Sequence, residues 1–325
     1  MNELESMGMR NIWLDGIMGV VVGDALGLPV QFKSREDLRR NPLKGMVGYG
    51  TFYLPAGSWS DDSSLTLATL DSLRECNTIN CDDIMERFSD WLMDGRYTPF
   101  SESYDQGATC VRAIRNYMRN SDAEKCGVTG EYANGNGALM RIMPVCLWAY
   151  EKVKNGDWTD EDALEAVHTV SALTHNHLRS QMACGIYYFM IKCIIDMEGP
   201  LIERMQKGID EAVIFYHKLP ENLLQLAFYN RLFHLDTFKE TSESDIASSG
   251  YVLDSIEAAI WCLLNTDSIE ESLLKAANLG ADTDTVAAIA GGLAGLYYGY
   301  KTIPEGWLDK IQKRSWIEYL CRKNQ

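Results

Sequence analysis

Two short acidic segments of the chain combine carboxylates with hydroxyl groups, and each stands directly before a residue pattern typical of a helix. Carboxylate and hydroxyl oxygens are the ligands that hard cations such as Mg²⁺ and Mn²⁺ prefer. Brought together, the two segments would supply four carboxylates and two hydroxyls, which is enough for two divalent cations that share bridging ligands. The predicted metal ligands are Ser60, Asp61, Asp62, Asp282, Asp284 and Thr285.

An aspartate at such a place can also serve simply as the cap of a helix. The first backbone N–H groups of a helix and its dipole both favour negative charge there. Capping explains a single carboxylate well and a pair of them poorly. Without a cation, four clustered carboxylates would repel one another, and some of them would have to bind a proton. We therefore favour the metal site.

Two glycine-rich helices are predicted to position the acidic segments. One covers residues 11–28 by its apolar periodicity and ends at Pro29, and the other follows Thr285. Glycine costs a helix about 1 kcal/mol relative to alanine, so repeated glycines need a packing reason. We expect the two helices to approach closely at the centre of the fold. The repeated glycines are Gly16, Gly19, Gly23, Gly27, Gly291, Gly295 and Gly299.

The acidic segments resemble the motifs of the ADP-ribosylglycohydrolase family, which carries a Thr/Ser-Asp-Asp motif early and a Gly-Asp-Thr-Asp-Thr-like motif late. Here the segments read Ser-Asp-Asp at residues 60–62 and Ala-Asp-Thr-Asp-Thr at 281–285. Residues 23–32 match the first family signature, and intermediate segments match in order, so the resemblance covers nearly the full chain. It implies a compact bundle of many helices with a two-metal cleft. It also implies hydrolysis of a glycosidic bond of ADP-ribose.

The resemblance also assigns residues to the substrate. The run Gly135, Asn136 and Gly137 matches the family loop that cradles the diphosphate of ADP-ribose. Read physically, glycines let backbone N–H groups approach a ligand, and a following helix start can hold phosphate. His175 matches a family histidine near the substrate ribose. For Arg141, which follows the loop, a structural ion pair is the alternative.

One residue departs from the family pattern. Gln31 stands where the family usually has a glutamate to which a catalytic or gating role is assigned, and an amide can neither take a proton nor carry negative charge. Asp62 or Asp105 would then accept the proton of the attacking water. Asp105 resembles an acidic residue that faces the ribose in the nitrogenase-related branch, with an ordinary helix cap as the alternative.

Three other interpretations stay open at the level of sequence. The departure at Gln31 could mark a catalytically weak or inactive protein that binds ADP-ribose. The same acidic cluster could hydrolyse a nucleotide phosphoester. His175 and His177 could form a zinc pair, although no third nitrogen or sulfur ligand stands at a matching spacing.

Composition limits the class of protein. The chain has 325 residues, of which 46% are hydrophobic, and we expect one domain over residues 1–325. Strand patterns are sparse, which predicts an all-α fold. A formal net charge of −16 disfavours general binding to nucleic acid or anionic membranes. The apolar run 182–197 is short for a membrane span and contains Lys192.

The N-terminal five residues do not resemble an export signal. Nine cysteines are scattered without a Cys-x-x-Cys pair, as in a cytosolic protein with reduced thiols. We expect a cytoplasmic monomer whose partners are ADP-ribose or an ADP-ribosylated substrate.

Overall fold

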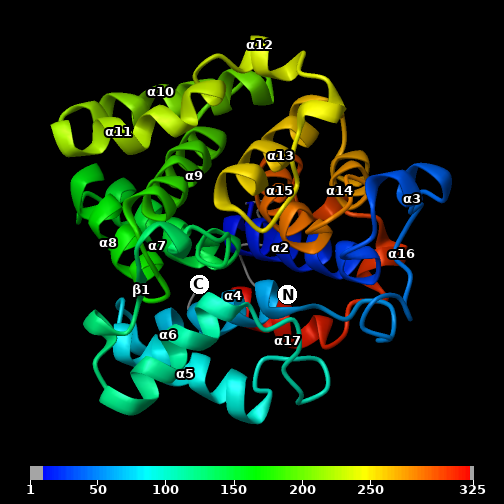
Figure 1. Cartoon of the computed structure of the whole chain (residues 1–325), viewed down its shortest axis with the longest axis horizontal. Helices are drawn as coiled ribbons and strands as arrows, with labels where there is room; N and C mark the ends of the chain where they lie inside the picture. Colours follow the sequence, from blue (N-terminus) through cyan, green and yellow to red (C-terminus); the bar gives the residue numbers. More distant parts are fainter. Residues whose placement is uncertain (1–9, 323–325) are drawn as a thin grey trace.

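The computed structural model describes residues 10–322 and is almost entirely helical in that range (Figure 1), which confirms the all-α prediction. The N-terminal residues for which no export signal is expected lie outside the described range. The α-helices are α2 Ile12–Gly27, α3 Arg35–Arg40, α4 Asp61–Cys76, α5 Cys81–Asp94, α6 Ala108–Asn120, α7 Met143–Lys154, α8 Asp160–Ala172, α9 Leu178–Asp196, α10 Leu201–His217, α11 Leu223–Leu226, α12 Leu235–Lys239, α13 Val252–Leu264, α14 Ile269–Ala277, α15 Thr283–Tyr298, α16 Glu305–Leu308 and α17 Arg314–Arg322.

Short elements complete the chain. Strands β1 and β2 have two residues each and run parallel, with Val128 opposite His175 and Thr129 opposite Asn176. The strands are β1 Val128–Thr129 and β2 His175–Asn176, and the 3₁₀ turns are η1 Leu28–Val30, η2 Ala123–Lys125, η3 Glu131–Ala133, η4 Leu139–Arg141, η5 Pro220–Asn222, η6 Ala227–Phe233, η7 Glu243–Asp245 and η8 Tyr300–Thr302.

Helices α2 and α15 pack antiparallel, with their backbones in contact. A Cβ atom at Gly19 would lie 2.0 Å from the carbonyl oxygen of Gly291, and one at Gly23 would lie 2.1 Å from that of Ala287. Real side chains do not approach that closely, so only glycine fits at both places. The predicted close approach of the two glycine-rich helices is confirmed. Gly299 is not part of the contact, because it ends α15 with φ +91°.

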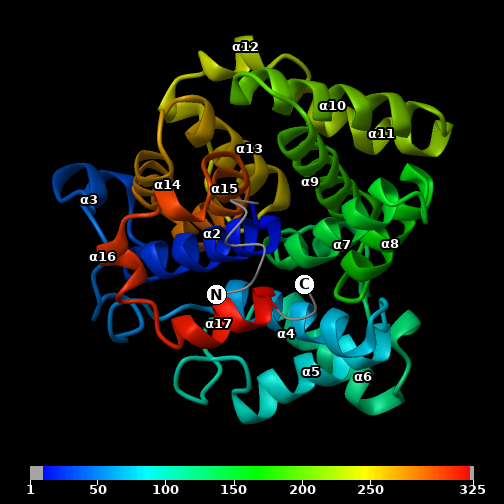
Figure 2. The same ribbon diagram turned by 180° about the vertical axis from the view of Figure 1, so that it is seen from behind.

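The α2–α15 pair forms the centre of the molecule. Figures 1 and 2 place α2 between α14 and α15 on one side and α4 and α17 on the other. The side chains of α2 from Trp13 to Gly27 are all buried. The segment Ile12–Val30 is long and apolar enough to cross a membrane by length and composition. However, 94% of its window is buried inside the protein, as in a core helix.

Residues 236–250 have the composition of an exposed loop or a lid, and most of them are exposed, but Arg35 ties the segment to the body of the protein. The guanidinium of Arg35 donates to the carbonyl oxygens of Glu243 (2.5 Å) and Ile246 (2.7 Å) and to the hydroxyl of Ser248 (3.2 Å). Ile246 and Ser248 are themselves buried. The backbone N–H of Asp282 donates to the carbonyl oxygen of Ser248 at 3.0 Å, so the end of the segment is attached to the start of α15.

The α2–α15 contact gives a test by mutation. The substitution Gly19→Ala should lower the free energy of unfolding by at least about 2 kcal/mol, because overpacking outweighs the gain of about 1 kcal/mol in helix propensity. Urea denaturation measures the change. Gly306→Ala is the matched control, since a Cβ there meets nothing within 4 Å, and it should leave stability unchanged or slightly higher. Equal stability of Gly19→Ala and wild type would contradict the close backbone contact.

Candidate active site

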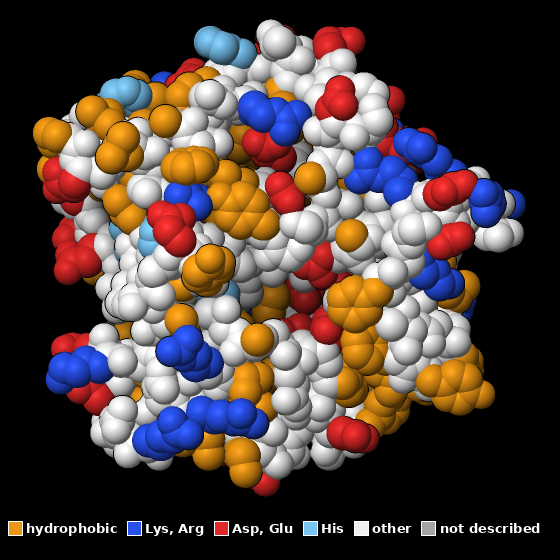
Figure 3. All heavy atoms as spheres, viewed as in Figure 1, with side chains coloured by type: hydrophobic (Ala, Val, Ile, Leu, Met, Phe, Trp, Pro, Cys, Tyr) orange, Lys and Arg blue, Asp and Glu red, His pale blue; other side chains and the backbone are white. Residues whose placement is uncertain are grey.

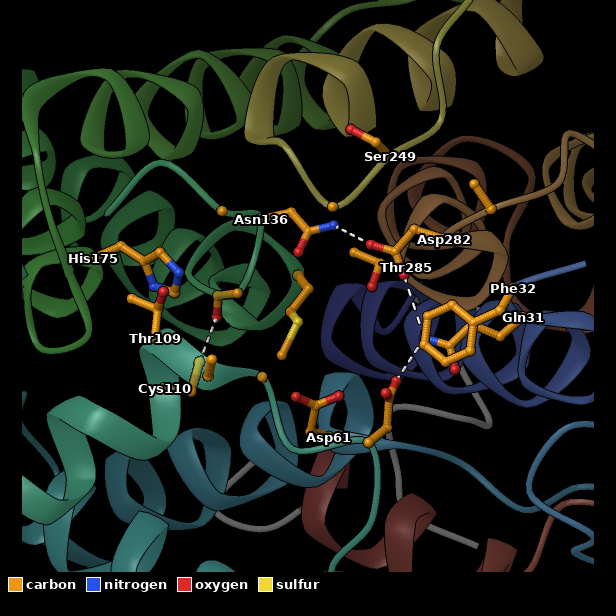
Figure 4. Close-up of a pocket in the computed structure, with 18 residues that line it drawn as sticks. Gln31, Phe32, Asp61, Thr109, Cys110, Asn136, His175, Ser249, Asp282 and Thr285 are labelled. Atoms are coloured by element: carbon orange, nitrogen blue, oxygen red, sulfur yellow. Dashed lines mark hydrogen bonds between the residues drawn. The ribbon is translucent and has the colours of Figure 1, made fainter. Parts of the chain in front are cut away.

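A cavity of about 420 Å³ opens where the first turns of α4 and α15 meet the end of α2 (Figure 4). Its lining comes from segments that are far apart in the chain. The lining includes Gln31, Asp61, Asp105, Gly135, Asn136, Gly137, His175, Asp282 and Thr285. Most of the residues predicted from sequence to form the site are thus brought to one place.

The start of α4 presents the first acidic pair. The hydroxyl of Ser60 caps the helix by accepting from the backbone N–H of Asp62, and it also donates to Asp62 Oδ2 at 2.9 Å. The hydroxyl of Thr285 donates to the same oxygen at 3.3 Å. Asp61 lies in the cavity wall and faces the start of α6, where a Cβ at Gly107 would be 3.8 Å from its Oδ2.

The start of α15 presents the second acidic pair. Thr283 donates through its hydroxyl to the carbonyl oxygen of Gly27 at 2.9 Å and so joins α15 to α2. Asp282 occupies the cap position but makes no capping hydrogen bond, and it accepts instead from the side-chain amide of Asn136 at 2.6 Å. The alternative that these aspartates serve as ordinary helix caps is therefore wrong for Asp282.

Three buried carboxylate oxygens have no hydrogen-bond partner within the described part of the chain, both oxygens of Asp284 and Oδ1 of Asp62. A buried polar atom without a partner is costly, and a bound ion or water can supply the missing partner. Burial and the neighbouring carboxylates raise the pKa of Asp62 and Asp284 well above the ordinary value. Oxygen donors in this arrangement fit a divalent cation.

Asp24 is a residue of the site that the sequence did not single out. One oxygen each of Asp24, Asp62 and Asp284 lie within 4.8 Å of one another. The carboxylate of Asp24 accepts from the backbone N–H groups of Ser60 and Ser63 and from the Ser63 hydroxyl. Burial raises the pKa of Asp24 to about 6. Since its oxygens already have these donors, Asp24 holds the start of α4 in place.

Gln31 joins two carboxylates. Its side-chain amide donates to Asp105 Oδ2 at 2.7 Å and lies 3.4 Å from Asp282 Oδ1. Asp105 has left-handed backbone, with φ +52°, and Gly107 rather than Asp105 caps α6. The helix-cap alternative for Asp105 is wrong. Burial raises the pKa of Asp105 above the ordinary value.

The glycine loop lies against His175. A Cβ at Gly137 would come within 2.8 Å of His175 Cε1. The sequence predicted a helix start directly after the loop. The loop instead continues into the 3₁₀ turn η4, and α7 begins only at Met143. Burial and the charge of Arg141 lower the pKa of His175 to about 3, so its ring is neutral at pH 7.

Arg141 and His177 have structural positions. The buried guanidinium of Arg141 donates to the Thr174 hydroxyl at 2.8 Å and to the carbonyl oxygen of Val170 at 3.1 Å rather than to a carboxylate, so the expected alternative of an ion pair is wrong. The same Thr174 hydroxyl lies 2.9 Å from His175 Nδ1. His177 caps α9 by accepting from the backbone N–H of Arg179. Arg141 therefore acts on the cavity through the placement of His175.

A family model described as ADP-ribosylglycohydrolase matches residues 8–324. The chain belongs to the ADP-ribosylglycohydrolase family. It is accordingly an enzyme of this family, and the resemblance noted in its motifs is confirmed. The cavity described above is lined by Asp61 of the first acidic motif and by Asp282 and Thr285 of the second.

Relatives within the ADP-ribosylglycohydrolase family cover nearly the whole chain. ADP-ribosylarginine hydrolase Tri1 of Serratia proteamaculans is 31% identical over 307 residues, which are 94% of this chain and 77% of that protein. ADP-ribosyl-[dinitrogen reductase] glycohydrolase of Rhodospirillum rubrum is 31% identical and covers 93% of this chain and 90% of its own length. A solved structure titled ADP-ribosylglycohydrolase-related protein complex aligns with a TM-score of 0.74, 28% identity and coverage of 96% and 95%.

The buried carboxylates predict a pH dependence of stability. These carboxyl groups have a higher pKa in the folded protein than in the unfolded chain. Their contribution to the free energy of unfolding is therefore fully present below about pH 4, the unfolded pKa, and is lost as the pH rises through the folded-state pKa values. In EDTA, the melting temperature of wild type should therefore fall between pH 5 and pH 8, and Mg²⁺ should restore it.

The matched variant is Asp284→Asn, which removes one buried charge. In EDTA at pH 8 it should be more stable than wild type by on the order of 3 kcal/mol, and it should lose most of the response to Mg²⁺. The exposed Asp267→Asn is the control and should behave as wild type. If neither Mg²⁺ nor Mn²⁺ changes the melting temperature of wild type, the assignment of the buried carboxylates as metal ligands is contradicted.

Proposed function

We propose that the chain hydrolyses the glycosidic bond between ADP-ribose and an acceptor, with two divalent cations, Mg²⁺ or Mn²⁺, held by Ser60, Asp61, Asp62, Asp282, Asp284 and Thr285. The observation that carries the proposal is the set of partnerless carboxylate oxygens on Asp62 and Asp284, which are buried behind a cavity wall that includes Asp61 and Thr285. Carboxylate oxygens of this kind suit a divalent cation.

The cavity suggests how ADP-ribose would lie. Gly135 and Gly137 would face its diphosphate, because the absence of side chains lets backbone N–H groups approach phosphate. Asn136 is held by Ser255 at 2.8 Å and by Asp282, so it would connect the phosphate side to the acidic side. The neutral ring of His175 would lie by the ribose.

The bond at the anomeric carbon breaks through an oxocarbenium-like transition state. Bound cations would polarise the ribose hydroxyls and lower the pKa of a water molecule. Asp105 is better placed than Asp62 to accept that proton, because Asp105 lines the cavity, whereas Asp62 is fully buried and receives two hydroxyl donors. Gln31 orients the Asp105 carboxylate through its amide.

The acceptor is proposed from the relatives. The Serratia relative is named for ADP-ribosylarginine, so an arginine linkage is the first to test. The proposal includes a single domain over residues 1–325, a monomer and a cytoplasmic location, which stay predictions. The strongly acidic charge supports the absence of general nucleic-acid or membrane binding.

Turnover on a panel of ADP-ribosylated arginine, serine, acetyl and nucleobase compounds tests the reaction. We expect release of free ADP-ribose from at least one compound in Mg²⁺ or Mn²⁺ and none in EDTA. Asp105→Asn should lower kcat by about 10²- to 10⁴-fold, the usual contribution of a general base. Release of a nucleotide monophosphate instead would indicate phosphoester hydrolysis, and Asp267→Asn again serves as the control.

Gln31→Glu tests the departure from the family pattern. A carboxylate there could also accept a proton. Turnover should therefore rise, by no more than the about 10²- to 10⁴-fold that a general base contributes. The glutamate would also face Asp105 and Asp282 without an amide proton to donate. The variant should therefore melt lower than wild type in EDTA and gain more from Mg²⁺.

The control for this variant is Asn230→Asp, which adds the same charge at an exposed position of η6. If wild type is already fast and Gln31→Glu changes nothing, another group carries the proton. If both forms bind ADP-ribose and neither turns over any compound, the chain is an ADP-ribose-binding protein rather than a hydrolase.

A further inference from the structure

A group of exposed and half-buried aromatic side chains lies beside Phe32, which lines one end of the cavity. Phe32, Tyr49 and Tyr53 are 67%, 63% and 77% exposed, although aromatic rings usually gain from burial. The ring of Phe52 lies 6.3 Å from that of Phe32 and 6.1 Å from that of Tyr104, and the rings of Tyr49 and Tyr53 are 5.4 Å apart. We call these five residues the aromatic wall.

The backbone beneath the aromatic wall is held firmly. The hydroxyl of Thr51 donates to the carbonyl oxygen of Gln31 at 2.6 Å, and its backbone N–H donates to that of Pro29 at 3.1 Å. A Cβ at Gly50 would lie 1.8 Å from the Pro29 carbonyl oxygen, so the loop and residues 29–31 are in backbone contact. The wall is therefore a preformed surface and needs little ordering to bind a ligand.

Three residues of the wall have strained backbone. The φ angles of Phe32, Tyr49 and Tyr53 are +65°, +58° and +55°, a region that bulky residues rarely adopt. Glycine or asparagine would adopt it more easily. Exposed rings contribute little to folding, so nothing in the fold itself favours an aromatic residue at these positions. Strain of this kind is typical of functional surfaces.

The aromatic wall meets the proposed reaction site at Phe32. Phe32 follows Gln31 directly, and both line the cavity at the end away from His175 (Figure 4). In Figure 3, hydrophobic side chains gather beside the red carboxylates of the hollow. If ribose and diphosphate lie towards His175, as in the proposed function on which this inference rests, the group released from ADP-ribose leaves past the wall.

We propose that the aromatic wall binds the polypeptide that carries the ADP-ribosylated residue, and that basic residues flank the modified side chain. Aromatic faces attract cations, and the exposed Glu102 and the cavity carboxylate Asp105 lie on the loop of Tyr104. Lys33 follows Phe32, but the chain as a whole carries a charge of −16, which disfavours a nucleic-acid acceptor.

The experiment compares substrates with one linkage on different acceptors. The probes are an ADP-ribosylated ten-residue peptide with lysines beside the modified residue, its counterpart with glutamates, the ADP-ribosylated free amino acid, and an ADP-ribosylated single-stranded oligonucleotide. The variants are Tyr53→Gly, which relieves the backbone strain, and Tyr53→Asn, which keeps a side chain that tolerates the conformation. Tyr319→Ala, at a 60% exposed tyrosine on α17, is the matched control.

We expect wild type to have a lower KM for the lysine peptide than for the glutamate peptide. Each Tyr53 variant should raise the KM for the lysine peptide about 3- to 10-fold, as loss of one aromatic contact would, while its kcat and its kinetics on the free amino acid stay unchanged. The melting temperature should change by less than about 2 °C, since the ring is exposed. Tyr319→Ala should match wild type throughout.

Several results would overturn the inference. Equal effects of the Tyr53 variants on peptide and free amino acid, or no effect on either, would remove the wall from acceptor binding. Turnover of the oligonucleotide that depends on Tyr53 would assign the wall to nucleic acid. If wild type turns over no linkage, the hydrolase proposal fails separately, and fluorescence anisotropy then decides. The labelled ADP-ribosylated lysine peptide must bind more tightly than free ADP-ribose and lose that advantage in Tyr53→Gly.

Discussion

The backbone contact between α2 and α15 determines where the acidic groups of the cavity lie. At its end nearest the cavity, a Cβ at Gly27 would lie 2.4 Å from the carbonyl oxygen of Thr283 and 2.5 Å from the backbone nitrogen of Asp284. Thr283 closes this end with its hydrogen bond to Gly27. One turn earlier, Asp24 accepts from the start of α4. A single helix thus places both acidic segments.

This rigidity explains how like charges stay together. Buried carboxylates such as Asp62 and Asp284 would separate or take up water if their helices could move apart, because repulsion in a poorly solvated site is strong. Glycine-to-backbone packing leaves no side chain that could shift to relieve it. The same packing that stabilises the core therefore maintains an arrangement that is unfavourable without a cation, as expected of a preorganised binding site.

The sequence predicted the features of the fold and of the site that depend on residues close together in the chain. Helical periodicity predicted α2, repeated glycines predicted its contact with α15, and the paired acidic motifs predicted the acidic side of the cavity. Asp24 was missed because a lone aspartate in an apolar helix carries no spacing signal. The place of residues 236–250 depends on Arg35, which is more than 200 residues away in the chain. Asp105 resembles a helix cap in sequence, and only the fold shows its partner, Gln31.

The Gln31 contacts show why the departure from the family pattern should be considered together with Asp105. An amide can donate to a carboxylate, and the Gln31 amide donates to Asp105 and lies 3.4 Å from Asp282 Oδ1. A glutamate at the same place would need to hold a proton, or a cation would have to compensate a third charge. Compared with a glutamate, the Gln31 amide leaves the cavity with one negative charge fewer, and its hydrogen bond holds the Asp105 carboxylate in place. The acid–base group of this site is then a property of the pair, Gln31 and Asp105, rather than of either residue alone.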